Sequence, residues 1–387
     1  MPDSASPQCS IWSYADPGQR GYGLFKLNFF RELKKRGWQT HLAEVPLLEP
    51  GAQAQLREDF LSQDRPWVLL INQTAAQLAD YLGLPREKAL AGRRFLVWFL
   101  DDPRFFLDGP LTQQEIALCF DETYLDILAA HQPRHVLFWP LAADCQQPGQ
   151  LDERFRCEVC FVGGVVDQRQ RRSQLQPAMR EYVDHLVELK LTHREKTFDE
   201  LALQHPIAPG KQIRITPQVA HYLYWEANNR YRLSVVEAMQ DFDLRIYGNE
   251  GWLSLLEGSP LLERFHGPID PNHELPHCFA TAPINLNIHS IQCMGSLNQR
   301  DFNAPVAGGF LLSDWAPAAG RYFNPGQEAV YWSQIDDLRA KAAYFLRHPE
   351  ERQALVERGR KRVEQSHTYA QRIDSLLAHL AEWGETG

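Results

Sequence analysis

Short apolar runs alternate with helical stretches along this chain, and that alternation limits the fold more than any other feature. Trp67 to Asn72, Phe95 to Leu100 and His135 to Trp139 are mostly apolar runs of strand length. Such runs are typical of parallel strands buried on both faces, with the helical stretches between them as crossovers. The first 150 residues are therefore predicted to form a doubly wound α/β domain.

A glycine-bearing loop follows the first predicted strand, which spans Ser10 to Tyr14. Apolar residues then recur at helical spacing from Leu24 to Gly37, and glycine often ends a helix. The loop between strand and helix lies at the edge of the sheet where doubly wound folds bind ligands. The residues expected there are Arg20, Gly21 and Gly23.

The second half of the chain repeats the pattern. A strand at 157–162 runs into Gly163 and Gly164, and more strands are predicted at 244–247, 284–288 and 310–312. Helices are predicted over about 169–203, 219–239 and 334–383. We expect one α/β domain at 1–150, a second at 151–365 with a helical insertion at about 169–240, and a final helical segment at 366–387.

Composition narrows the classes of function. The 387 residues include 40 Lys and Arg and 49 Asp and Glu, so the net charge is −9, which argues against a nucleic-acid-binding protein. No apolar run approaches the roughly 20 residues of a membrane span, and no secretory signal is visible. Seven scattered cysteines favour reduced thiols and a cytoplasmic location. Peripheral contact with a membrane surface is left open.

Two patterns with metal-ligand spacing are interpreted as structural. Cys157 and Cys160 have metal or redox spacing, but they lie in an apolar run that predicts a buried strand. Asp241 and Asp243 match the triplet of metal-dependent glycosyltransferases, but they precede a strand and so lie at the end away from the ligand. No metal site and no cofactor is therefore predicted.

Several segments resemble the spore-maturation (CgeB-like) glycosyltransferases. The resemblance covers most of the chain and is carried by RCEVCFVGGVV (156–166), LRIYGNEGW (244–252) and above all NLNIHSIQCMGSLNQRDFNAPVAGGFLLSD (285–314). It implies a GT-B fold, with two Rossmann-like domains facing a cleft. It also implies that the C-terminal domain binds a nucleotide-sugar donor, that the N-terminal domain binds the acceptor, and that the last helix crosses back to the first domain.

A nucleotide sugar needs its diphosphate neutralised, and without a metal that falls to helix N-termini, backbone N–H groups and arginines. Arg300 lies in the first turn of a predicted helix and is the leading candidate for a catalytic cation. An exposed arginine on a solvated helix face is the alternative. The other candidate donor-binding residues are Gly163, Gly164, Arg169, Gly248, Gly251, Gly295, Ser296, Asn298 and Asn303.

The chain departs from the family pattern at two of these positions. Asn303 stands where an acidic residue usually bonds the ribose, and Ser296 stands where the second acid of the broader family's motif would be. An amide can still bond a diol, but more weakly than a carboxylate. The departure puts donor affinity in question, and not the fold.

Two adjacent carboxylates follow the predicted strand at 95–100. Asp101 is expected on the acceptor side, and Asp102 is a candidate base for the acceptor hydroxyl. An aspartate before Pro103 also commonly shapes a turn or caps a helix. Both interpretations of Asp102 stay open at this point.

Three functions compete. The first is a cytoplasmic, metal-independent glycosyltransferase that moves a sugar to a hydroxyl-bearing acceptor. The second is a weak or inactive relative that acts as a nucleotide-sugar-binding scaffold. The third is a sugar-nucleotide epimerase, which would share the two-domain architecture but needs cleft carboxylates and histidines that the sequence does not reveal.

Overall fold

The computed structural model describes residues 10–15, 20–44, 52–62, 67–143, 149–208, 210–211 and 215–385. The chain divides into two compact units. Unit 1 combines Met1–Asp144 with Ser366–Gly387, and unit 2 is Cys145–Gln365. No helix of the described residues is long and apolar enough to cross a membrane.

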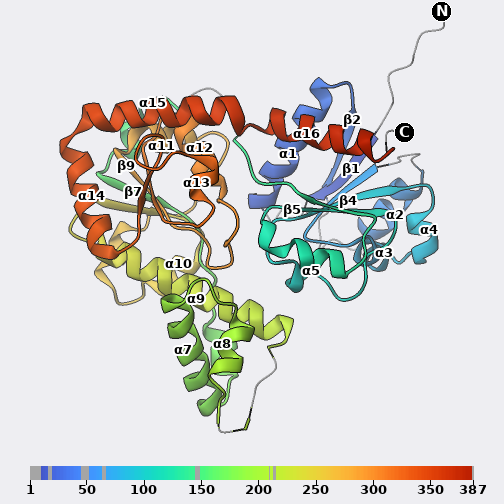
Figure 1. Ribbon diagram of the computed structural model, residues 1–387, viewed down its shortest axis with the longest axis horizontal. Helices are drawn as coiled ribbons and strands as arrows, with labels where there is room; N and C mark the ends of the chain where they lie inside the picture. The colour runs from blue at the N-terminus through green and yellow to red at the C-terminus, as the bar shows by residue number, and fades with distance from the viewer. Residues whose placement is uncertain are drawn as a thin grey trace, which may run out of the picture. The chain divides into compact units, whose positions relative to one another are not determined.

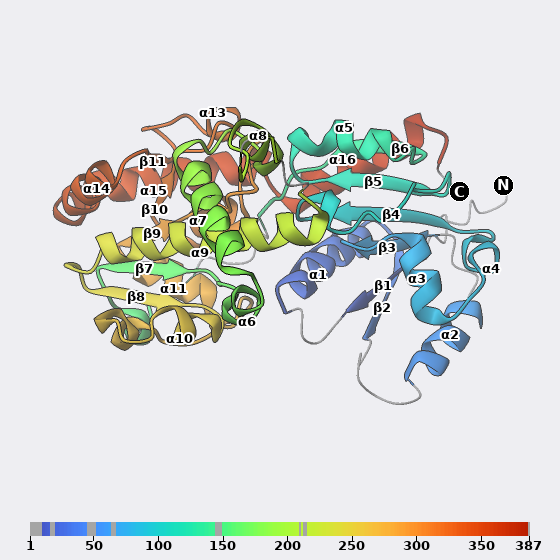
Figure 2. The ribbon, with the colours of Figure 1, turned by 90° about the horizontal axis from the view of Figure 1, so that it is seen from below.

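Unit 1 is built on a six-stranded parallel sheet in the order β2-β1-β3-β4-β5-β6. The parallel strands β4 and β5 lie side by side in Figure 2. The predicted strands are confirmed, whereas β2 and β5 were not singled out in the sequence. The strands are β1 (Ser10–Ala15), β2 (Gln39–Glu44), β3 (Trp67–Ile71), β4 (Arg94–Phe99), β5 (Glu115–Cys119) and β6 (His135–Phe138).

Helices connect these strands, as a doubly wound fold requires. The α-helices are α1 (Arg20–Lys35), α2 (Ala52–Ser62), α3 (Ala75–Leu82), α4 (Arg86–Leu90), α5 (Leu125–Ala130) and α16 (Tyr369–Glu382). Two 3₁₀ turns, Pro103–Phe105 and Glu122–Tyr124, follow β4 and β5.

The helix α16 closes unit 1 from the far end of the sequence. Arg36 of α1 donates from Nε to Asp374 of α16 at 2.6 Å, and the indole of Trp139 donates to the carbonyl of Arg372 at 2.9 Å. A capping box at Thr368 starts the helix. These bonds fix the last helix to the first domain.

The predicted loop at 16–23 is shorter than expected. Helix α1 begins at Arg20, so Arg20, Gly21 and Gly23 lie in its first turn rather than in a loop. Residues 16–19 lie outside the described residues. Glycine is tolerated in this first turn. The N–H groups there have no intrahelical acceptors, so glycine destabilises the helix less than it would in the interior.

Unit 2 holds a five-stranded parallel sheet in the order β11-β10-β9-β7-β8. The largest part of its core includes Phe161, Leu244, Leu286 and Leu312, and smaller buried clusters lie around Cys160 and Phe279. The predicted strands are confirmed, and β11 is the one that sequence reasoning missed. The strands are β7 (Val159–Val162), β8 (Leu244–Tyr247), β9 (Ile284–Asn287), β10 (Leu311–Asp314) and β11 (Val330–Trp332).

A helical insertion separates β7 from β8. The predicted helical region at 169–203 is split into three helices, because Pro177 starts one of them and a capping box at Thr197 starts another. Figure 1 shows α7 and α8 projecting from α9 away from the sheet of unit 2. The four helices are α6 (Arg169–Ser173), α7 (Pro177–Thr192), α8 (Phe198–Gln204) and α9 (Pro217–Ala238).

The remaining helices of unit 2 alternate with its later strands. They are α10 (Gly251–Leu255), α11 (Leu275–Thr281), α12 (Gln299–Ala307), α13 (Ala319–Tyr322), α14 (Ile335–Arg347) and α15 (Pro349–Ser366), with 3₁₀ turns at Glu153–Phe155 and Pro260–Arg264. The carboxyl ends of the parallel strands meet at one edge, and the loops there carry most of the polar groups described next.

Candidate functional site

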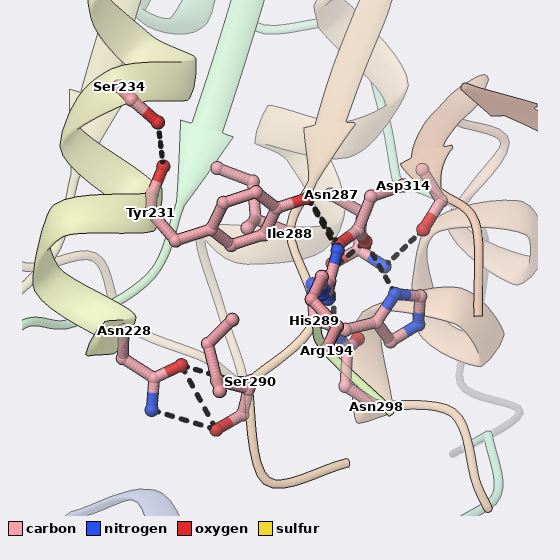
Figure 3. Close-up of polar contacts among 12 residues, drawn as sticks. Arg194, Asn228, Tyr231, Ser234, Asn287, Ile288, His289, Ser290, Asn298 and Asp314 are labelled. Carbon is pink, nitrogen blue, oxygen red and sulfur yellow. Dashed lines mark hydrogen bonds and ion pairs between the residues drawn. The ribbon is translucent and has the colours of Figure 1, made fainter. Parts of the chain in front are cut away.

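The long helix α9 holds the loops at the carboxyl edge of the unit 2 sheet. Its residues Asn228 and Tyr231 point toward the segments that follow β9 and β10 (Figure 3). Asn228 accepts from the backbone N–H of Ile291 at 2.7 Å, and Tyr231 donates to Asp314 at 2.9 Å. The insertion therefore positions the candidate site as well as enlarging the domain.

The glycine loop after β7 is fixed on all sides. Asn229 and the backbone of Val166 exchange two hydrogen bonds, at 2.6 and 3.1 Å. Asn249 does the same with the backbone of Val165, at 2.8 and 2.9 Å. Trp252 donates to the carbonyl of Gly163 at 2.7 Å. These contacts fix the conformation of the loop backbone.

Gly248 and Gly251, which were predicted to bind the donor, pack closely against this loop. A Cβ atom at Gly248 would lie 2.3 Å from the carbonyl oxygen of Gly163, and one at Gly251 would lie 2.6 Å from that of Val165. Both contacts are too short for any side chain. At Gly164, a Cβ would meet the Asn249 side chain at 3.1 Å, so close approach of chain segments explains these glycines.

Arg300 and Arg232, the arginine pair, lie at the same edge and are the main electrostatic feature of unit 2. Arg300 donates from Nε to Asn287 at 2.8 Å and from Nη2 to the carbonyl of Ile288 at 3.0 Å. Arg232 donates to the carbonyl of Gly164. Among the described residues, neither guanidinium has a carboxylate in an ion pair, and the Nε of Arg232 is buried without a hydrogen-bond partner.

Burial disfavours the charged forms of both arginines of the pair. Burial, together with the charge of Arg300, lowers the pKa of Arg232 to about 10. Burial also lowers the pKa of Arg300, against the opposing influence of nearby Asp301 and Asp314. Both carboxylates are already engaged with His289. Arg232 is buried and Arg300 is half-buried, and two such cations without an ion-paired carboxylate among the described residues are an arrangement that an incoming anion stabilises.

The start of α12 adds donors beside Arg300. Asn298 caps the helix, accepting from the backbone N–H of Arg300 at 2.9 Å and donating to Asn287 at 2.9 Å. Ser296 is fully buried, and within the described part of the chain its hydroxyl has no hydrogen-bond partner. Gly295 is buried next to it. The structure thus brings Gly295, Ser296, Asn298 and Arg300 together at a helix N-terminus.

Two other predicted donor-binding residues lie differently. Arg169 is exposed and pairs with Asp167 at 2.9 Å and with Glu257 at 2.8 Å, so its charge is already neutralised at the surface. Asn303 is half-buried on α12 and accepts from Gln299 at 3.0 Å, one turn away on the same helix.

The two carboxylates of unit 1 have distinct surroundings. Asp102 is fully buried and caps the 3₁₀ turn by accepting a hydrogen bond from the backbone N–H of Arg104. It also forms an ion pair with the guanidinium of Arg104 at 2.5 Å. Asp101 is half-buried and accepts from Asn72 at 2.8 Å. Asn72 has a positive φ of 51°, uncommon outside glycine. The structure favours the capping interpretation of Asp102.

The patterns with metal-ligand spacing are engaged in packing and ion pairs. Cys157 and Cys160 are buried. Asp241 pairs with Arg339 at 2.6 Å and Asp243 with Arg264 at 3.4 Å. A search of the described residues found no group of three or more His, Cys, Asp or Glu side chains able to hold a metal ion.

Sequence reasoning missed Arg232, His289 and Asp314. A usable signal for Arg232 was the run Asn228-Asn229-Arg230-Tyr231-Arg232 in the middle of a predicted helix, because polar residues on a buried helix face need partners. His289 and Asp314 each stand at the end of a predicted strand, where a doubly wound fold binds ligands.

Comparisons with known proteins agree with this architecture. Residues 224–378 match a family model described as Glycosyl transferase-like. Sucrose-phosphate synthase from Thermosynechococcus elongatus has a similar fold, with a TM-score of 0.56 at 12% identity over 97% of this chain and 100% of that one. HepE from Anabaena, solved with UDP and glucose, has a TM-score of 0.56 at 10% identity, again over 97% of this chain and 100% of that one.

A second structure of Anabaena HepE, in complex with UDP-glucose, has a TM-score of 0.54 at 10% identity over 96% of this chain and 99% of that one. No match was found among curated proteins. With its two parallel-sheet, Rossmann-like domains the chain has the fold of the GT-B glycosyltransferases, and its residues 224–378 match the glycosyl transferase-like family.

Proposed function

We propose that this protein is a glycosyltransferase that uses a nucleoside-diphosphate sugar as donor and transfers the sugar to a hydroxyl group without a metal ion. The observation that carries the proposal is the arginine pair. Arg232 and Arg300 add two positive charges at the carboxyl edge of the unit 2 sheet. A nucleoside-diphosphate sugar carries two negative charges on its diphosphate, so ligand and site match in charge.

The chain's own residues suit departure of a diphosphate. When the bond between the anomeric carbon and the phosphate oxygen breaks, negative charge grows on the leaving group. Fixed donors that bond that charge lower the barrier more than they strengthen ground-state binding. Arg300 is held by Asn287, and the loop at Gly164 is held by Asn249, so both are arranged before the ligand arrives. The free hydroxyl of Ser296 adds a third donor.

The finer assignment to the CgeB-like glycosyltransferases belongs to the same proposal. It is supported by the residues 285–314, which include the Asn287, Asn298 and Arg300 side chains that bond one another. Asn303 is proposed to contact the ribose, as the resemblance implies. The printed ligands of HepE, UDP and UDP-glucose, make UDP-sugars the first donors to test.

One observation favours a second candidate, a nucleotide-sugar-binding protein with little activity. Ser296 and Asn303 stand where the resemblance leads us to expect acids. Neither neutral side chain provides a charged acceptor for the ribose, which weakens donor binding relative to an acidic site. The arginine pair is shared by both candidates, so a binding measurement alone does not separate them.

The deciding experiment is incubation with a panel of labelled UDP-, GDP-, TDP- and CMP-sugars, scoring transfer, hydrolysis and epimer formation in excess EDTA. We expect a diphosphate sugar to bind and to be transferred or hydrolysed with EDTA present. Binding without turnover indicates the second candidate, and epimer formation indicates an epimerase. Activity that is lost in EDTA and restored by Mn²⁺ or Mg²⁺ contradicts metal independence.

A further inference from the structure

A buried histidine joins two carboxylates beneath the arginine pair. His289 is fully buried, and its Nδ1 lies 2.5 Å from Asp314 while its Nε2 lies 2.8 Å from Asp301. Figure 3 shows His289 and Asp314 among the side chains gathered at the ends of β9 and β10. Both carboxylates are themselves about 1% exposed.

Each carboxylate also holds another part of the site. Asp301 accepts at 3.1 Å from the backbone N–H of Asn298, which caps α12, and at 3.1 Å from Asn287. Asn287 in turn accepts from Nε of Arg300. Three hydrogen bonds, through Asp301 and Asn287, therefore connect the imidazole of His289 to the guanidinium of Arg300.

The other carboxylate connects the same histidine to the helical insertion. Asp314 accepts from Tyr231 of α9 and pairs at 3.2 Å with Arg194, which lies between α7 and α8. Arg194 also lies over the ring of Tyr231, 4.4 Å from its centroid. The insertion and the start of α12 are thus joined through His289.

We propose that His289 is a positioning residue of the donor site, a doubly protonated imidazolium whose two N–H groups hold Asp301 and Asp314 together and so set the position of Arg300. The inference rests on the proposed function and adds a residue that does not touch the donor. A neutral imidazole has one N–H and would leave one carboxylate facing a lone pair at hydrogen-bond distance. Between two ionised carboxylates, only the doubly protonated ring donates a hydrogen bond in both contacts.

The electrostatics agree with the geometry. Burial by itself would lower the pKa of His289, but the two carboxylates outweigh burial and raise that pKa to about 10. Asp314 is also affected: burial would raise its pKa, but His289 and Arg194 hold it well below its usual range. The formal charges of His289 and the half-buried Arg194 equal those of two ionised carboxylates at Asp301 and Asp314, so this group needs no charge from the arginine pair.

The first test measures the protonation state directly. In protein labelled with ¹⁵N at histidine, spectra at pH 8.5 are expected to show one of the 14 histidines with both ring nitrogens protonated. The signal is assigned by its loss in the His289→Gln variant. A spectrum in which no histidine is doubly protonated at this pH overturns the proposal, whether or not the variant folds.

The second test measures the affinity for UDP by calorimetry. We expect His289→Gln to weaken UDP binding by roughly tenfold or more, a size typical of coupled buried networks. Arg194→Met removes the ion pair with Asp314 at the outer end of this network. It should weaken UDP binding less than His289→Gln does. The control is Met239→Ala, a fully buried core residue of unit 2 outside this network, which lowers stability but should keep the parent's UDP affinity.

The outcomes separate the two proposals. If folded His289→Gln binds UDP within about threefold of the parent, the positioning role is wrong. If His289→Gln does not fold, Arg194→Met decides: parent-like affinity overturns the proposal and a specific loss supports it. If the parent itself binds no nucleotide, the proposed function fails, and the ¹⁵N spectrum still reports on His289.

Discussion

Arg232 and Arg300 repel one another at the carboxyl edge of the unit 2 sheet, and the charge of Arg300 contributes, after burial, to lowering the pKa of Arg232. A protein keeps such a pair at a cost to its own stability. We therefore expect the ligand-free protein to gain stability when one of these charges is removed, and the protein with a bound anion to lose stability.

The first prediction follows from that repulsion. Arg232→Met should leave the thermal stability of the ligand-free protein equal to or above that of the parent, because a buried, unneutralised charge is removed. The same variant should bind UDP at least about tenfold more weakly, since a charge-assisted hydrogen bond contributes about 1.5–3 kcal/mol. Differential scanning fluorimetry with and without UDP measures both. A parallel fall in stability and no change in UDP affinity would show that Arg232 is structural.

The second prediction concerns the rate of transfer. Arg300→Ala should lower the single-turnover rate by about two to three orders of magnitude, as expected on losing one preorganised donor to a developing charge. Arg300→Lys should recover part of that loss, because an ammonium lacks the forked geometry of a guanidinium. Arg169→Ala is the matched control, since Arg169 is exposed and already paired with Asp167. Circular dichroism confirms that each variant is folded.

The third prediction tests the departure from the family pattern at Asn303. Asn303→Asp should preserve or strengthen donor binding if this side chain bonds the ribose, because a charged acceptor makes stronger hydrogen bonds. Asn303→Leu should weaken it. Calorimetric titration with a UDP-sugar is the measurement. Equal affinities in both variants and the parent would mean that Asn303 does not contact the ribose and has a structural role, such as its contact with Gln299.

The fourth prediction separates the two interpretations of Asp102. Because Asp102 is buried, caps a 3₁₀ turn and pairs with Arg104, Asp102→Asn should lower the free energy of unfolding by about 1–3 kcal/mol. The rate of transfer per folded molecule should change little. Urea unfolding and transfer assays are run side by side, with Asp101→Asn for comparison. A large, specific loss of rate in folded Asp102→Asn would instead restore the role of base.

The fifth prediction is a dependence of stability on pH. The folded-state pKa of His289 is raised to about 10, above the value of about 6.5 in the unfolded chain. Its stabilising contribution is therefore full below pH 6.5 and is lost as the pH rises toward 10. The pKa of Arg232 is lowered to about 10, so the destabilisation caused by its charge is relieved only above about pH 10, outside this window. The charged and titratable groups that interact with His289 or with its two carboxylates, Asp301 and Asp314, include Arg194, Tyr231, Arg232, Arg300 and Tyr331.

Urea unfolding at pH 6 and pH 9 provides the measurement. The parent should lose more stability between these values than His289→Gln, and the difference between the two proteins removes the contribution of the other histidines. A variant with the same pH dependence as the parent would show that His289 does not carry a raised pKa.

The fold was predictable where burial is continuous along the chain. β3, β4 and β7 are buried on both faces and appear as apolar runs, so their sequences predict them. β5 (EIALC) is buried along its whole length but begins with Glu115, and it was not singled out. β2 (QTHLAE) and β11 (VYW) are edge strands of their sheets and are polar or very short, so they carry little signal. The α1 start was placed too late because its first turn contains two glycines.

The candidate site was predictable only where its residues are close in sequence. Gly295, Ser296, Asn298 and Arg300 fall within one helix start, and the capping pattern identifies them. Arg232 reaches the same place from a helix that follows β7 by a long insertion, and a tertiary contact of that kind leaves no local pattern. His289 depends on two aspartates that come from different elements.

The return of α16 to unit 1 has a consequence for synthesis on the ribosome. A chain emerges N-terminus first at about 5–20 residues per second, so Met1–Asp144 leaves the ribosome before the whole of unit 2 has been made. During that interval the hydrogen bond from Trp139 to the carbonyl of Arg372 and the ion pair between Arg36 and Asp374 cannot form, because α16 has not yet been synthesised. Unit 1 therefore cannot complete its fold until the chain of unit 2 has been synthesised, although most of unit 1 is translated first.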